Sequence, residues 1–328
     1  MIALVETLEL AVLAAVLFCA ATAALSAVAF PLVRGRLARL DPAPRTSLLL
    51  ALTAAPVAAG VLLTALCFLP GELFLAGFHD HCAGHPGHVH LCLVHHPPLD
   101  QGLVGWVVVI LAAVALAGVA ARQGLRLLRS ARAVAALRGV ARAADGMPGV
   151  HVIDADVPVS VAAGLVRPAV YLSSGFVRAV APDVMAVVQA HERAHVRRRD
   201  PLRLLLANLL SMAHLPGTRR ALTADLALAT EQACDDEAVR AVGDRVRVAR
   251  AVLTIERLVA AAPASPDLVA ASFGGSHVPS RVETLLSDTT WRPARGLPAW
   301  TAAAALALLL GASPLHHVTE TFLSWLTR

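Results

Sequence analysis

The chain has 328 residues, of which 57% are hydrophobic and only 16% are charged, and its mean hydropathy is +0.66. These values exclude a disordered chain, and they are far too apolar for an ordinary soluble enzyme. Aromatic residues make up only 4%, so the apolar mass is Ala, Leu and Val, which suits membrane helices better than an all-β core. The formal net charge is +5, with every basic residue an Arg, and the five Cys are too scattered for a disulfide scaffold.

Four stretches of the chain are long and uncharged enough to cross a bilayer, which requires roughly 20 apolar residues. They cover residues 10–33, 46–71, 102–121 and 296–313. A cleaved signal peptide is the alternative for the first stretch. Against it, Glu6 and Glu9 precede the stretch without any Arg, and the stretch is too long. The sequence therefore predicts a mainly α, multi-pass membrane protein with four transmembrane helices.

The placement of Arg predicts the orientation, because loops rich in Arg remain on the cytoplasmic side of the cell (inner or plasma) membrane. The inner loop 34–45 and the segment 122–142 are rich in Arg, and two Arg precede the fourth span, whereas the outer loop 72–101 has none. Both termini are thus expected outside. The predicted organisation is three transmembrane helices in 1–121, a cytoplasmic domain in 122–296, and a fourth transmembrane helix with a short external tail in 297–328.

Two further segments bear on how the chain meets the membrane. The Arg-rich segment 122–142 lacks the aromatic residues of a nucleic-acid surface, so we expect it to contact anionic lipid headgroups rather than nucleic acid. Residues 204–217 are uncharged but too short to span a bilayer. A buried core helix and a membrane-leaning segment both fit this second pattern.

Within the predicted cytoplasmic domain, residues 191–195 match the pattern H-E-x-x-H. On a helix, His191 and His195 lie on one face and can bind the same metal ion, and Glu192 beside them can accept a proton from the attacking water. A stripe of Val residues leads into the two His, and Pro182 and Asp183 form a helix start signal. The alternative, that the His only continue a core face, leaves two buried imidazoles without partners.

A catalytic zinc ion requires a third protein ligand, and an acidic segment follows 36 residues downstream of His195. Glu231 and Asp235 are separated by one helical turn, so a helix directs both toward one site. We assign Glu231 as the third zinc ligand and Asp235 as the acceptor for the N–H of a ligand His. Cys234 should then point elsewhere, as a buried structural thiol. An acidic, solvated helix face is the alternative for this segment.

Three segments together resemble the BlaR/MecR-type membrane zinc metallopeptidases. They are Pro158–Pro168 (P-V-S-V-A-A-G-L-V-R-P), the H-E-R-A-H-V-R-R-R-D run at 191–200, and E-Q-A-C-D at 231–235, with a weaker match at R-V-E-T-L-L, 281–286. The resemblance implies an α+β gluzincin-like zinc endopeptidase with His191, His195 and Glu231 as ligands and Glu192 as the catalytic base. It also implies signal transduction, with a BlaI-type cytoplasmic repressor as the substrate.

The resemblance adds a substrate-binding element to this picture. Residues 150–173 are rich in Val and are interrupted by Gly164 and Pro168, which predicts two short strands. In gluzincins such an edge strand holds the substrate in an extended conformation. His214 and Tyr171 are candidates for stabilising the oxyanion. The oligomeric state stays open, a homo-oligomer being one option.

The chain departs from the sensor-transducers of this family in two ways. It ends at Arg328, so we expect no external penicillin-binding sensor domain, and the stimulus is unknown. The outer loop is also rich in metal-ligating side chains, namely His79, His81, Cys82, His85, His88, His90, Cys92, His95 and His96. This loop is predicted either to bind metal, to carry a disulfide between its two Cys, or to be a solvated linker without a ligand.

Two other functions compete with the repressor-cleaving peptidase. A CAAX-type or quality-control membrane protease uses the same chemistry, but the R-R-R-D continuation and the G-L-V-R-P segment favour the first interpretation. A non-catalytic, metal-binding membrane receptor would explain the His-rich loop. It would not explain why a complete set of zinc ligands and a base lies in the cytoplasmic domain.

Overall fold

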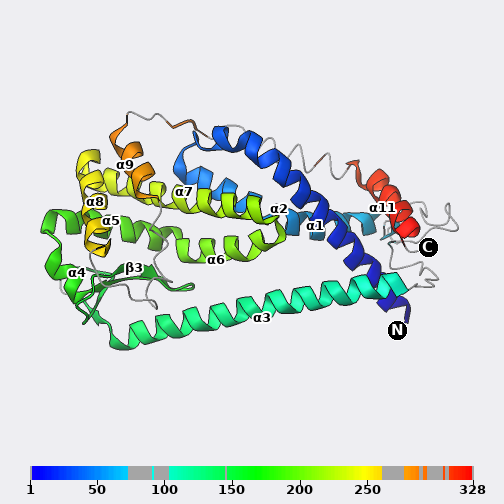
Figure 1. Cartoon of the computed structure of the whole chain (residues 1–328), viewed down its shortest axis with the longest axis horizontal. Helices are drawn as coiled ribbons and strands as arrows, with labels where there is room; N and C mark the ends of the chain where they lie inside the picture. Colours follow the sequence, from blue (N-terminus) through cyan, green and yellow to red (C-terminus); the bar gives the residue numbers. More distant parts are fainter. Residues whose placement is uncertain are drawn as a thin grey trace.

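The computed structural model describes residues 2–72, 91, 103–144, 146–260, 277–287, 291–293, 306 and 310–326. Among these residues three helices are long and apolar enough to cross a membrane: α1 (Ile2–Leu37), α2 (Pro42–Glu72) and α3 (Leu103–Val140). They contain the first three predicted spans. The long α3 also carries the Arg-rich segment as far as Val140, where its side chains are largely exposed along one edge of the molecule (Figure 1).

The fourth predicted span falls mostly outside the described residues, as does the His-rich outer loop apart from Leu91. Helix α11 (Ala312–Leu326) follows the predicted span and packs against α2. The short segment beyond residue 313 is therefore helical, and its external location stays a prediction. Helix α11 is amphipathic, with His316, Glu320 and Leu323 on a buried face, each no more than 2% exposed.

A second, sheet-containing part of the chain follows α3. Its elements are β1 (Arg142–Ala143), β2 (Val150–Ile153), β3 (Ser160–Ala163), β4 (Ala169–Ser173), α4 (Ser174–Ala179), α5 (Pro182–Arg198), α6 (Asp200–Leu210), η3 (Ser211–Ala213), α7 (Pro216–Val242), α8 (Arg245–Ala260) and α9 (Val278–Leu286). The strand order is β1-β2-β4-β3, with β2 and β4 parallel and the other pairs antiparallel. Strand β3 therefore forms an edge of the sheet.

Residues 150–173 form three strands rather than the two that were predicted. Gly164 has a φ of +112°, which favours glycine, and it begins the turn that joins β3 to β4. The bend before Pro158 separates β2 from β3. The sequence pattern predicted the break at Gly164 and Pro168, but it did not predict this earlier bend.

The main core lies between the sheet and helices α4, α5, α8 and α9. Its largest fully buried side chains are Leu172 of β4 and Phe176 of α4, each 0% exposed. The predicted Val stripe of α5 faces this core, with Val187 at 2% and Val188 at 3% exposed. Helix α5 begins at Pro182 as expected, since proline fits the first turn of a helix. The buried stripe fixes the rotation of α5, and with it the direction of His191 and His195.

A second apolar cluster joins the membrane helices to α6 and α7. Phe30 of α1 and Leu49 of α2 pack against Leu204, Leu222 and Leu226. Residues 204–217 thus contribute buried side chains to this junction. The same segment also leaves exposed Leu side chains, namely Leu206, Leu209 and Leu215. The segment therefore has a buried side in this junction and an exposed side that carries Leu residues.

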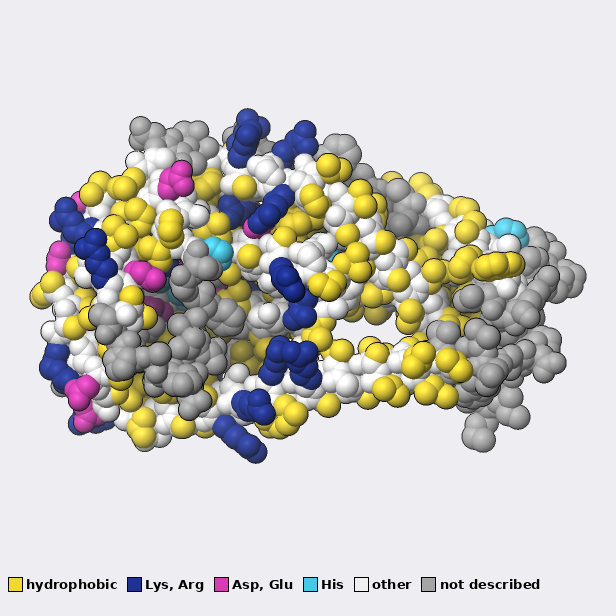
Figure 2. Space-filling model, in the orientation of Figure 1, with side chains coloured by type: hydrophobic (Ala, Val, Ile, Leu, Met, Phe, Trp, Pro, Cys, Tyr) yellow, Lys and Arg dark blue, Asp and Glu magenta, His cyan; other side chains and the backbone are white. Residues whose placement is uncertain are grey.

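Arg side chains mark a boundary on the surface. Figure 2 shows them in a band across the middle of this face, between the largely apolar surface of the long helices and the mixed surface of the sheet-containing part. Exposed Arg residues include Arg34, Arg36 and Arg39 at or just after the end of α1, and Arg122, Arg126 and Arg129 midway along α3. This distribution is the one expected where membrane helices leave the bilayer.

Candidate metallopeptidase site

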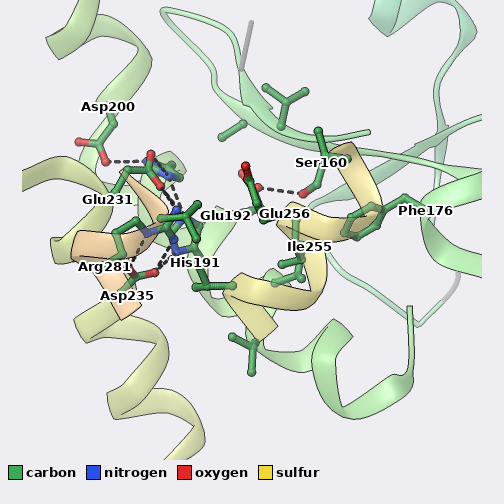
Figure 3. Close-up of a pocket in the computed structure, with 18 of the residues that line it drawn as sticks. Ser160, Phe176, His191, Glu192, Asp200, Glu231, Asp235, Ile255, Glu256 and Arg281 are labelled. Carbon is green, nitrogen blue, oxygen red and sulfur yellow. Dashed lines mark hydrogen bonds and ion pairs between the residues drawn. The ribbon is translucent and has the colours of Figure 1, made fainter. Parts of the chain in front are cut away.

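Helices α5 and α7 bring His191, His195 and Glu231 together around one point. Figure 3 shows His191 and Glu231 at this point. The Nε2 atoms of the two imidazoles are 3.1 Å apart. Glu231 Oε2 lies 3.4 Å from His191 Nε2, and Glu231 Oε1 lies 3.6 Å from His195 Nε2. These three donor atoms come from residues far apart in the sequence, and only the packing of α5 on α7 makes them neighbours.

The donor set fits a zinc ion. A tetrahedral zinc site with metal–ligand distances of about 2.0 Å separates neighbouring ligand atoms by about 3.3 Å. The three observed separations bracket this value. Two imidazole nitrogens and one carboxylate leave a fourth position open, which is the arrangement of catalytic rather than structural zinc sites.

Each imidazole is held from behind by a carboxylate. Asp235 Oδ1 is 3.0 Å from His191 Nδ1, and Asp200 Oδ2 is 2.9 Å from His195 Nδ1. An Nδ1–H that donates to a carboxylate leaves the Nε2 lone pair free for a metal, so these contacts fix the useful tautomer. The sequence predicted Asp235 in this role for one of the two His, and the structure pairs it with His191. The sequence did not single out Asp200 for the same role on His195.

Cys234 is fully buried, as expected, but it does not point away from the site. Its Sγ lies 3.3 Å from His195 Nδ1 and donates to Asp200 Oδ2 at 3.5 Å. Burial, together with the negative charge of Asp200 and Glu231, raises the pKa of the thiol well above its ordinary value. The thiol thus packs in its protonated form behind His195.

Arg281 of α9, like Asp200, belongs to the site although the sequence did not predict it there. Its Nε and Nη2 atoms donate to Asp235 at 2.8 and 2.7 Å, and its Nη1 lies 2.9 Å from Glu231 Oε2. Burial alone would raise the pKa of Glu231 and Asp235, but the guanidinium, together with the neighbouring imidazoles, outweighs burial and lowers both. The weak sequence match at residues 281–286 was the only signal for Arg281.

The charge of these carboxylates also acts on His191. Burial by itself would lower the pKa of His191, but its hydrogen bonds with Asp235 and Glu231 outweigh burial and raise the pKa to about 10. Without a metal ion the imidazole therefore holds a proton at neutral pH. A metal ion would have to displace that proton, so metal binding at this site is coupled to proton release.

Glu192 faces a cavity of about 310 Å³ beside these three donors. Ser160 of the edge strand β3 donates its hydroxyl proton to Glu192 Oε1 at 2.8 Å. Residues 160–162 line one wall of the cavity, and apolar side chains line its floor: Phe176, Val187, Val188, Val252, Ile255 and Val278. The cavity thus combines a sheet edge, an apolar recess and a carboxylate next to the three donor atoms.

Neither candidate for stabilising an oxyanion lies at this cavity. His214 Nε2 bonds to the backbone oxygen of Leu52 in α2. Tyr171 stacks on His151, and its hydroxyl accepts a long hydrogen bond of 3.4 Å from Arg138. Both side chains thus make their contacts away from the cavity. The nine His and Cys residues predicted to form an external metal site lie outside the described residues.

A family model described as BlaR1 peptidase M56 matches residues 100–285, more than half of the chain. The chain belongs to the BlaR1 peptidase M56 family. The M56 match includes the whole of α5 and α7, and therefore every residue of the three-donor site. No solved structure matches the chain. Family membership identifies a peptidase, and the three apolar helices identify a membrane protein.

Proposed function

We propose that the chain is a membrane-embedded zinc endopeptidase whose domain at 122–296 lies in the cytoplasm. The convergence of His191, His195 and Glu231 carries this proposal, because their spacing suits a zinc ion with one open position. Zinc held there would polarise the scissile carbonyl and activate the attacking water. Asp235 and Asp200 would keep the two imidazoles in the tautomer and orientation that metal binding requires.

Glu192 is the proposed general base. It would accept the proton of the attacking water and pass it to the amine of the leaving peptide. Ser160 supports this role, because its hydroxyl holds one carboxylate oxygen of Glu192 at the cavity wall. An extended substrate would pair with β3, which is free of a strand partner on its cavity side within the described sheet. The apolar floor of the cavity would accept an apolar side chain next to the cleaved bond.

The substrate is proposed to be a cytoplasmic regulator, a BlaI-type repressor by family resemblance, cleaved in response to a signal that reaches the membrane helices. The band of Arg between the apolar helices and the sheet-containing part supports this orientation. Both termini would then lie outside the cell membrane. The outer loop and a fourth span at 296–313 complete the proposed topology.

A Glu192→Gln variant of the full-length protein tests the proposal. The variant should retain zinc, because the three donors are intact, and should lose roughly 10²- to 10⁴-fold in the rate of repressor cleavage. Glu283→Gln is a matched control, since Glu283 is an exposed carboxylate on α9 away from the cavity. Unchanged cleavage by the Glu192 variant would contradict the enzyme assignment. Zinc binding without cleavage in the unmodified protein would favour a metal-binding receptor.

A further inference from the structure

The hydrogen bonds behind His195 extend beyond the peptidase site into a membrane helix. Asp200 Oδ2, which accepts from His195 Nδ1, also accepts from Arg198 Nε at 3.2 Å. Arg198 Nη2 in turn donates to Thr46 Oγ1 at 3.1 Å. Thr46 belongs to α2, four residues after Pro42, where that helix begins. Three consecutive contacts thus connect a membrane helix to a proposed metal ligand.

Every member of this connection is shielded from water. Thr46 is 0% exposed and Asp200 is 1% exposed, while the side chain of Arg198 is 9% exposed. In such surroundings water cannot readily replace a lost partner, so breaking one contact leaves a buried polar group unsatisfied. The planar guanidinium is also suited to joining two acceptors in a fixed geometry, which a flexible ammonium would not do.

The local backbone explains why Asp200 can reach back to His195. Arg199 has φ +55° and ψ +40°, the only positive φ among the described non-glycine residues. This left-handed residue ends α5 and lets α6 begin at once in a new direction. The sharp corner between the two helices directs Asp200 toward the last turn of α5, where His195 and Arg198 lie.

The other end of the connection is fixed within α2 and the turn that precedes it. The Thr46 hydroxyl donates to the Pro42 carbonyl at 2.8 Å, and Asp41 caps the helix through the Ala43 N–H at 3.1 Å. The turn before α2 also pairs with Arg292, since Asp41 N donates to Arg292 O and Arg292 N donates to Arg39 O. A displacement of this end of α2 would therefore carry Thr46 with it.

We propose that Thr46 and Arg198 are positioning residues, through which the inner end of α2 holds Asp200 against His195 and thereby sets the metal affinity of the site. This inference rests on the proposed metal site. A shift of α2 relative to α5 lengthens the Thr46–Arg198 contact, frees the guanidinium and loosens the carboxylate that orients His195. The orientation of His195 then responds to the position of the membrane helix through Arg198 and Asp200.

Zinc affinity of the full-length protein in detergent, measured by competition with a chelator, tests the coupling. Thr46→Val keeps the shape of the side chain but removes the hydroxyl acceptor, and should weaken zinc binding roughly 2- to 30-fold. Thr46→Ser restores the hydroxyl and should bind zinc like the unmodified protein. Thr53→Val is the matched control: Thr53 is buried in the same helix, bonds only to the Leu50 carbonyl in the described structure, and should not change the affinity.

A double variant identifies the route. Arg198→Gln alone should weaken zinc binding, and adding Thr46→Val should cause no further loss, because Thr46 acts through Arg198. Additive losses would overturn the route, and a Thr46→Val protein with unmodified affinity would overturn the inference. If the unmodified protein bound no zinc, the proposed function would fail first. The two failures are therefore distinguishable, and Arg198→Gln alone serves if Thr46→Val does not fold.

Discussion

Replacing Arg281 by Met tests how much the guanidinium stabilises the buried carboxylates of the site. The guanidinium is the only described Arg group in contact with the buried carboxylates of Glu231 and Asp235. Met has a similar length and no charge, so the substitution removes the cation while filling most of its space. Both carboxylates remain in a pocket where Asp235 is only 2% exposed.

The size of the effect follows from what the substitution leaves behind. Removing one partner of a buried ion pair costs about 3–5 kcal/mol, because the remaining charge is neither paired nor hydrated. For a domain of this size that loss lowers the apparent unfolding midpoint by about 6–20 °C. A zinc ion next to Glu231 supplies positive charge of its own, so the loss should be largest in chelator and should shrink in excess zinc.

Calorimetry of the detergent-solubilised protein, in chelator and in zinc, measures these differences. Arg245→Met is the control. Arg245 donates to the carbonyl oxygens of Thr284 and Leu285 on α9, the helix of Arg281, and contacts neither carboxylate. Its smaller loss should be independent of zinc. An Arg281→Met protein as stable in chelator as the unmodified protein would refute the reasoning.

Lowering the pH should also reduce the difference in stability between the Arg281→Met protein and the unmodified one. The pKa values of Glu231 and Asp235 are lowered in the folded protein, so their ion pairs contribute stability above the unfolded pKa of about 4. That contribution is lost as the pH falls through the lowered values. The difference between the two proteins should therefore narrow below about pH 4.

Three further predictions concern single residues. The pKa of His191 is raised to about 10, so zinc binding below this pH should release about one proton, and zinc affinity should increase as the pH rises. Calorimetry in two buffers of different ionisation enthalpy counts that proton, and a count of zero would contradict the assignment. Because burial raises the pKa of Cys234, maleimide should label it only after denaturation, which peptide mass spectrometry detects. Phe176→Ala should cost about 3–5 kcal/mol through the cavity it leaves, whereas Val166→Ala, at an 85% exposed position, should be nearly neutral in the same unfolding assay.

Local patterns predicted the elements that local physics controls. The first three spans follow from uncharged apolar length, and α5 follows from the spacing of its Val residues between Pro182 and His195. The same periodicity places Glu231 and Asp235 on one face of α7. The strand count was wrong because the chain bends a second time between β2 and β3, where Asp156 and Pro158 are turn-forming residues that the prediction did not use.

Contacts between distant segments were beyond such patterns. Arg281 lies 46 residues from Asp235, and Ser160 lies 32 residues from Glu192. Asp200 is only five residues from His195, yet its contact depends on a left-handed Arg199, a conformation that side chains other than glycine rarely adopt. Asp200 and Pro201 signal the start of a new helix, but the residue types do not signal the left-handed turn that directs Asp200 toward His195.

The sequence by itself therefore determined a membrane protein with an apolar first third and a candidate metal-binding helix. Spacing along one helix is sufficient for that conclusion, because helical geometry fixes which side chains share a face. Only the tertiary structure decided which carboxylate stands behind each imidazole, which cation neutralises the site, and how α2 reaches His195. Those choices depend on the packing of α5 against α6 and α7, and of α7 against α2 and α9, which is set by apolar burial across the whole domain rather than by any local pattern.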